Sequence, residues 1–204
     1  MTNWRSSPWA NPGAWFLWVG LALLALSLWL PWLSASRTTR VELRAADLAE
    51  ALLEASHGFE PPLDAGDLAA IEGRFYALAT SRGVYARDLS RIAAAPDGAL
   101  LCMTNKHYAF QLAESPHNPD RTPSADSTAA VEVTAWPLSS IGPAHCAFFN
   151  PENAPRAYTR NLRASYAGLA ENRPKPGGPH RRVGLGSRVM SPYPGRDSER
   201  WLIY

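Results

Sequence analysis

The chain has 204 residues, which is enough for one modest domain and does not require a second. Its formal net charge of +2 gives no reason to expect a nucleic-acid-binding protein. Six of the eight tryptophans occur before residue 33, so the N-terminal part differs in character from the rest of the chain.

Residues 14–33 form an apolar segment of twenty positions without a charged side chain. At about 1.5 Å per residue, such a helix is roughly 30 Å long, which matches the hydrocarbon thickness of a bilayer. We therefore predict a transmembrane anchor at residues 14–36, after a flexible arm at residues 1–13. Four tryptophans bracket the leucine-rich centre, where indole rings can lie at the two headgroup levels. They are Trp15, Trp18, Trp29 and Trp32.

Two alternatives to a retained anchor stay open. A cleaved signal peptide could end at the small residues Ser34, Ala35 and Ser36. The apolar segment, however, is longer than the usual signal core of about 7 to 15 residues, and only Arg5 precedes it. The other alternative is a helix buried in a soluble protein.

Two features of the sequence give opposing indications of the side of the membrane on which the domain lies. Three arginines follow the apolar segment within residues 37–44, which favours a cytoplasmic domain by the positive-inside rule. The chain has only two cysteines, Cys102 and Cys146, which is typical of one disulfide in an oxidising compartment, although two cytoplasmic thiols remain the alternative. Because long segments translocate largely regardless of charge, we predict a single-pass protein of the inner (plasma) membrane with a periplasmic or otherwise extracytoplasmic domain.

The next residues predict two amphipathic helices. The first ends near Gly58, and the second begins at Asp64 or Asp67 and ends at residues 81–83. Apolar residues recur at helical spacing in both. In the first helix they are Val41, Ala45, Leu48, Leu52 and Ala55, and in the second Leu68, Ile71, Phe75 and Leu78. A further short helical turn is predicted at residues 86–94.

Beyond these helices, short runs separated by Pro, Gly, Asn and Asp are typical of antiparallel strands. In one run Val131 and Val133 alternate with Glu132 and Thr134, which predicts one buried and one solvent-exposed face. The predicted fold class is α+β, with the amphipathic helix packed on a small antiparallel sheet of four or five strands in a domain at residues 37–172. The runs are 99–104, 106–113, 129–136, 145–150 and 156–160.

Residues 173–204 are rich in Pro, Gly and Arg and predict an irregular tail whose end, residues 201–204, could dock on the domain. Seven basic residues against three acidic ones lie between residues 170 and 200. Of these, Arg181, Arg182 and Arg188 could contact anionic lipid headgroups or an acidic partner.

Three segments carry a resemblance to a known family. They are GVYARDLSRI at residues 83–92, KHYAFQLAES at residues 106–115 and VEVTAWPLSSIGPAHCAFFNPENAPRAYTRN at residues 131–161. Together with an apolar helix that runs into an amphipathic one, they resemble type IV pilins and the pseudopilins of type II secretion, over residues 14–168. The resemblance implies a pilin-like fold and a role in a secretion or surface assembly of the cell envelope.

The chain departs from that family near its N-terminus. Pilins are cut after a glycine and carry a glutamate a few residues inside the apolar helix, where it helps subunits assemble. Here Gly13 is followed by no acidic residue until Glu42. The departure implies a pilin-like fold used as a fixed anchor.

Candidate chemistry is sparse. A disulfide between Cys102 and Cys146 could stabilise the domain by about 3 to 4 kcal/mol in the chain-entropy model. His107 and His145 lack the spacing of metal ligands, and His57, His117 and His180 stand beside Gly or Pro and are predicted to be solvated. We therefore predict no catalytic residue, metal or cofactor.

We expect a structural or interaction protein that is not an enzyme. Its expected partners are the lipid bilayer and other pilin-like or secretion-system proteins, with no nucleic acid and no small-molecule substrate. The alternatives are a membrane-anchored hydrolase or metal-dependent enzyme of the envelope, and a secreted binding module released by signal peptidase after Ser36.

Overall fold

The computed structural model describes residues 12–93, 98–115, 130–181 and 191–204. The chain divides into two compact units, Met1–Thr39 and Arg40–Tyr204, and each is described by itself. The predicted N-terminal arm lies almost entirely outside the described residues.

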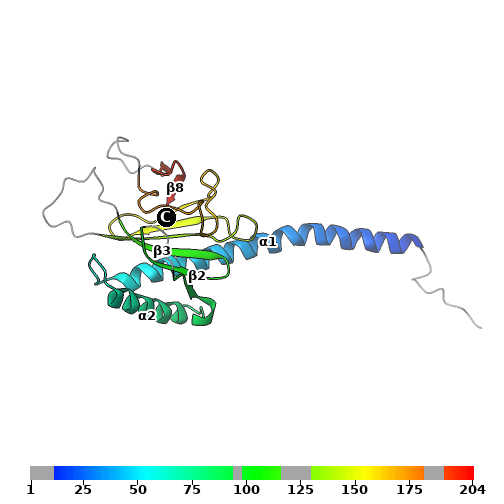
Figure 1. Ribbon diagram of the computed structural model, residues 1–204. Coiled ribbons are helices and arrows are strands. Elements are labelled where there is room, and N and C mark those ends of the chain that lie inside the picture. The colour runs from blue at the N-terminus through cyan, green and yellow to red at the C-terminus, as the bar shows by residue number, and fades with distance from the viewer. Residues whose placement is uncertain (1–11, 94–97, 116–129, 182–190) are drawn as a thin grey trace, which may run out of the picture. The chain divides into compact units, whose positions relative to one another are not determined.

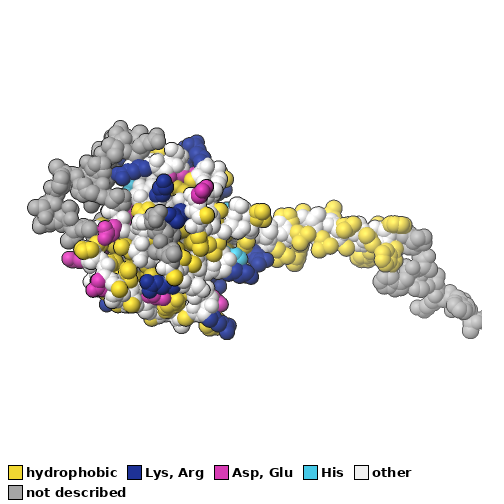
Figure 2. All heavy atoms as spheres, in the orientation of Figure 1, with side chains coloured by type: hydrophobic (Ala, Val, Ile, Leu, Met, Phe, Trp, Pro, Cys, Tyr) yellow, Lys and Arg dark blue, Asp and Glu magenta, His cyan; other side chains and the backbone are white. Residues whose placement is uncertain are grey.

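Helix α1, Pro12–Ser56, contributes to both units and is continuous through Pro31. Its apolar segment is long and apolar enough to cross a membrane. Large apolar side chains line the surface of this segment, as Figure 2 shows, and Trp29 and Trp32 form an edge-to-face pair with ring centroids 6.5 Å apart. No side chain from Trp15 to Leu33 is buried.

The second unit begins with the buried half of α1, in which Leu48 and Leu52 are fully buried. Helix α2, Ala65–Ser81, starts with a capping box, because the Asp67 N–H donates to the Asp64 carboxylate at 2.8 Å and the Asp64 N–H donates to Asp67 at 3.1 Å. Of the two predicted N-cap residues, Asp64 is the N-cap and Asp67 is the third residue of the helix. After α2 the chain forms the 3-10 helix η2, Ala86–Asp88, and then a short strand rather than a longer helical turn.

Within the described residues, eight strands form one sheet in the order β1-β2-β3-β4-β5-β6-β8-β7, with every neighbouring pair antiparallel. The α+β fold class is confirmed, and the sheet has more strands than the four or five that the sequence predicts. The bounds are β1 Ser90–Arg91, β2 Ala99–Thr104, β3 Tyr108–Glu114, β4 Val131–Pro137, β5 Ala147–Pro151, β6 Ala157–Thr159, β7 Tyr193–Pro194 and β8 Arg200–Ile203.

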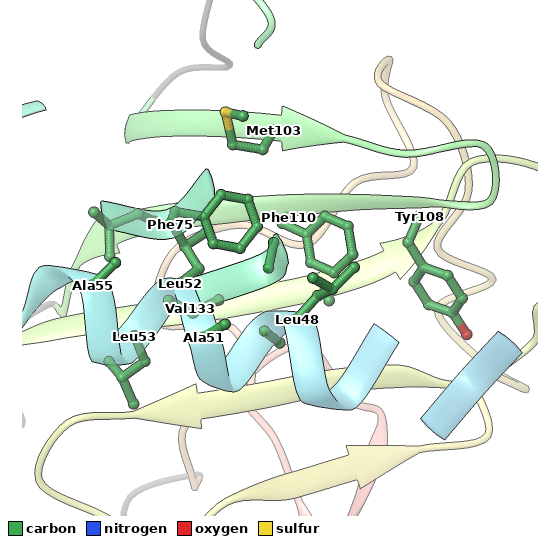
Figure 3. Close-up of a cluster of buried hydrophobic side chains, with 14 of the residues drawn as sticks. Leu48, Ala51, Leu52, Leu53, Ala55, Phe75, Met103, Tyr108, Phe110 and Val133 are labelled. Carbon is green, nitrogen blue, oxygen red and sulfur yellow. The ribbon is translucent and has the colours of Figure 1, made fainter. Parts of the chain in front are cut away.

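One face of the sheet is covered by the helices (Figure 1). Leu48 and Leu52 of α1 and Phe75 of α2 pack there against Phe110 and Val133, as Figure 3 shows. The phenyl rings of Phe75 and Phe110 have centroids 6.5 Å apart. Burial of these large side chains is the main source of stability for the unit, at about 1.5–3 kcal/mol for each.

The other face of the sheet carries a second core cluster, to which the C-terminal part of the chain contributes (Figure 1). Trp201 of β8 is fully buried there against Trp136 and Phe149. Glu132 and Thr134 are also buried on this face, with 1% and 5% of their surface exposed. The predicted solvent-exposed face was therefore wrong, because residues of the predicted irregular tail lie on it.

These features agree with the resemblance only at a coarse level. A long apolar N-terminal helix followed by a small antiparallel sheet is compatible with a pilin-like architecture.

Candidate functional site

The first candidate functional feature is the exposed apolar segment of α1. Trp18, Leu24 and Trp29 expose 67%, 60% and 64% of their surface, and the other large apolar residues from Trp15 to Leu33 are exposed in the same way. Soluble monomers seldom expose an apolar patch of more than a few hundred Å². Helical geometry satisfies the backbone groups in the interior of the segment, so lipid can cover it without leaving those groups unpaired.

The two predicted disulfide cysteines are free thiols in the structure. Cys102 lies in β2 and Cys146 directly precedes β5, so β3 and β4 separate them by three strand spacings, about 14 Å. A disulfide needs Cα atoms within about 7 Å of each other. In addition, Cys102 alternates with Leu101 and Met103, which face the helices, whereas Cys146 packs on the helix side. The sheet therefore keeps the two sulfurs apart and on opposite faces.

Both thiols are poor nucleophiles. Burial raises the pKa of Cys102 to about 11, with only partial relief from the positive charge of Arg173. Burial also raises the pKa of Cys146 to about 12, and the carboxylate of Glu42 adds to the effect by its charge and by a hydrogen bond. Because the thiolate is the reactive form, both side chains stay protonated and inert near neutral pH.

A polar cluster that the sequence did not predict lies between the sheet and the C-terminal segment. The imidazole Nε2 of His180 is 2.7 Å from the carboxylate of Glu132 and 3.0 Å from the hydroxyl of Ser115. The other carboxylate oxygen of Glu132 accepts the Gly177 N–H at 2.6 Å. His180 also packs edge-to-face on Phe149, with ring centroids 5.1 Å apart. The prediction of a solvated His180 was wrong, because only 14% of its side chain is exposed.

This cluster contains the residue types of a serine hydrolase but not the arrangement. In a catalytic triad the serine and the acid bond to different imidazole nitrogens, so that the base can accept a proton from one side while the acid orients it from the other. Here Ser115 and Glu132 both meet Nε2 of His180. The geometry instead joins the segment that carries Gly177 and His180 to the sheet.

A second buried polar group holds the end of the chain. Glu199 accepts the N–H groups of Arg163 and Ala164 at 2.9 and 2.7 Å and the hydroxyl of Thr159 at 3.0 Å. Burial raises the pKa of Glu199, but these donors outweigh it and the net pKa is lowered. Asp197 accepts hydrogen bonds from Tyr166 and Trp201, yet burial raises its pKa. Both carboxylates therefore accept hydrogen bonds from groups of the protein itself.

The remaining predicted site residues do not converge. His145 is exposed, and its N–H and that of Cys146 donate to Glu42 at 3.2 and 3.1 Å. Within the described ranges, no three His, Cys, Asp or Glu side chains are grouped so that they could hold a metal ion. His117 lies outside those ranges.

Of the three arginines predicted to contact lipid or an acidic partner, the structure describes one. Arg181 pairs through its backbone with Gly195, next to His180 and β7. Arg182 and Arg188 lie outside the described residues.

Signals for the missed residues were weak in the sequence. Glu132 occupied a strand position that alternation marks as solvent-exposed, and His180 lay between Pro179 and Arg181 in a stretch without periodicity. Their burial comes from long-range contacts, among them the pairing of the two side chains with each other.

Comparison with known proteins adds no further information on the site. No protein-family model matches the chain, and no curated protein and no solved structure is significantly similar to it.

Proposed function

We propose that this protein is a single-pass membrane protein of the cell envelope, whose α+β domain has a structural or interaction role in a secretion or surface assembly. The observation that carries the proposal is the contrast within α1 between Leu24, with 60% of its surface exposed, and Leu52, which is fully buried. One continuous helix thus supplies a core element to the domain and an apolar segment whose side chains from Trp15 to Leu33 are exposed among the residues that the structure describes.

The hydrophobic effect supports the membrane part of the proposal. Covering a Leu or Phe side chain yields about 1.5–3 kcal/mol, so a whole segment of such residues gains tens of kcal/mol from entering lipid. The tryptophans near its two ends are the residues that anchor transmembrane helices at the headgroups. This gain far exceeds the net stability of a typical domain.

A non-catalytic role is supported by how the polar groups are used. Glu132 bonds to Gly177 and His180, and Glu199 to Thr159 and Arg163, and these bonds join segments that are far apart in sequence. Such groups give rigidity to a domain that presents a fixed surface, whereas an active site needs side chains that converge on a substrate.

The proposed side of the membrane is extracytoplasmic. With both cysteines free, the disulfide no longer supports this placement. The remaining support is that translocation of a long domain depends little on the charges that follow the span. Protease added to intact spheroplasts would degrade an external domain and spare a cytoplasmic one.

The membrane proposal is tested with the full-length chain and a Leu23→Arg/Leu24→Arg variant. Arginine at the centre of a spanning helix costs about 2.5–3.5 kcal/mol per residue on insertion scales. After an alkaline wash, the original chain should remain in the membrane pellet and the variant should move to the supernatant. Tyr85→Arg, at an exposed position of the domain, is the control and should stay in the pellet.

If the original chain is found in the supernatant, the proposal fails. A soluble product whose first residue follows Ser36 would instead identify a secreted module released by signal peptidase.

A further inference from the structure

The loops at one end of the second unit form a single surface. Hydrogen bonds from the N–H groups of His145 and Cys146 to Glu42 bring the β4–β5 loop to the point where α1 enters this unit. The register pairs Tyr108 with Pro137, and Ala147 with Thr159. Strand pairing therefore places the β2–β3 turn and the residues after β6 at the same end. We call this surface the entry end, and it consists of residues 40–44, 105–107, 138–146 and 160–165.

Two aliphatic side chains stand out at the entry end. Ile141 in the β4–β5 loop exposes 88% of its surface and Leu162 after β6 exposes 80%. Both values exceed the 77% of Phe16, the most exposed large apolar residue of the anchor segment. Neither side chain contributes to a core cluster, so folding of the domain does not account for either.

The same surface is strongly basic. It carries five exposed Lys and Arg side chains against one carboxylate, Glu42, so the formal charge is 5 − 1 = +4. Glu42 is already engaged by two backbone N–H groups. Within the part of the chain that the structure describes, none of the five cations has an ion-pair partner. They are Arg40, Arg44, Lys106, Arg160 and Arg163.

Connectivity limits how far this surface can be from a membrane. Only seven residues of the chain separate Leu33, which ends the apolar segment, from Arg40, which begins the second unit. Even when fully extended, seven residues span at most about 25 Å, so an anchored chain keeps the start of the second unit near the membrane. Protruding aliphatic side chains flanked by arginines are the combination that binds at the boundary between headgroups and acyl chains.

We propose that the entry end rests on an anionic bilayer surface, with Ile141 and Leu162 inserted among the headgroups and the basic side chains on lipid phosphates. This proposal rests on the proposed membrane anchor and assigns the domain a fixed orientation on the lipid. Each basic residue near an anionic surface strengthens such a contact by roughly fivefold, and high salt weakens it.

The test uses the full-length chain in nanodiscs made of phosphatidylglycerol and phosphatidylcholine, with a nitroxide quencher on the lipid headgroup. A fluorophore is attached after Ile141→Cys, and after Asn153→Cys in the exposed β5–β6 turn as the control at the opposite end of the sheet. The two natural thiols label slowly because burial raises their pKa. We expect strong quenching at position 141 and none at position 153.

A charge variant separates lipid contact from mere proximity. Arg160→Gln/Arg163→Gln should reduce the quenching at position 141, whereas the matched pair Arg74→Gln/Arg156→Gln, remote from the entry end, should leave it unchanged. Half-molar salt should also reduce the quenching at position 141, because it screens the attraction between the basic side chains and the lipid.

Equal quenching at positions 141 and 153 would overturn the proposal, and so would equal quenching at position 141 in nanodiscs of phosphatidylcholine alone. A chain that does not enter nanodiscs at all contradicts the anchor itself, so the two failures are distinguishable.

Discussion

The more apolar half of helix α1 is the exposed half, and the less apolar half is the buried one. The N-terminal half carries the longest apolar run of the chain, and its side chains from Trp15 to Leu33 are exposed among the described residues. The half that includes Leu48 and Leu52 carries charges between its apolar residues and is buried on one face. Burial within the protein therefore follows the amphipathic pattern that fits a sheet, not the greatest apolar content. A helix that is apolar all round needs an apolar surrounding on every side, and a bilayer supplies one.

The largest expected effect on the stability of the domain comes from its buried half. Leu52→Ala removes a fully buried side chain between the helices and the sheet, and the resulting cavity should lower the free energy of unfolding by about 2–5 kcal/mol. Leu24→Ala, the same change in the exposed half, should alter it by less than about 0.5 kcal/mol. Urea unfolding of the full chain in detergent micelles measures both.

Equal effects of the two substitutions would mean that the two halves do not have separate roles. The difference between them is therefore more informative than either value.

The next largest effect on stability is expected on the face of the sheet that carries Glu132. Glu132→Ala removes the acceptor of the Gly177 N–H and the partner of His180, and unpaired buried donors cost about 1–3 kcal/mol. Glu114→Ala, at the exposed end of the neighbouring strand, is the control and should have little effect. Limited proteolysis would locate the change, since cleavage should increase in the C-terminal segment first.

If Glu132→Ala leaves both the stability and the cleavage pattern unchanged, the C-terminal segment is held by apolar contacts such as those of Trp201 and not by this carboxylate.

These two faces also separate what sequence alone can predict from what it cannot. The cap of α2 at Asp64, the buried face of Ile71 and Phe75, and the bounds of β2 follow from patterns within a few residues. On the face that carries Glu132, the C-terminal segment is held by pairs such as Glu132 with His180 and Thr159 with Glu199, which are 48 and 40 residues apart. No local periodicity encodes such pairs, so a stretch rich in Pro, Gly and Arg was predicted to be an irregular tail.

The prediction of a disulfide was wrong for a related reason. A count of two cysteines indicates that a pair can form, but the strand order decides whether the sulfurs meet. Cys102 and Cys146 lie on opposite faces of the sheet, and this alternation could be recognised only after the order of the strands was known.

The most gradual effect is expected at alkaline pH. Burial raises the pKa of Cys102 to about 11, above the value of about 8.5 for a free thiol, so the folded state holds its proton more tightly than the unfolded state. Stability is then fully present below about pH 8.5 and is lost as the pH rises toward 11. Cys102→Ala should make the decline between pH 9 and 11 less steep, as measured by unfolding at a series of pH values. An unchanged decline would assign it to other groups.

The account depends most directly on the lipid environment of the apolar segment. The decisive measurement is intact mass spectrometry of the protein extracted from alkali-washed membranes, alongside the soluble fraction of the same cells. We predict that the membrane extract holds a chain that includes residues 14–33 and that the soluble fraction holds none. A chain that begins after Ser36 and is found only in the soluble fraction would contradict the membrane anchor and the orientation of the domain proposed from it.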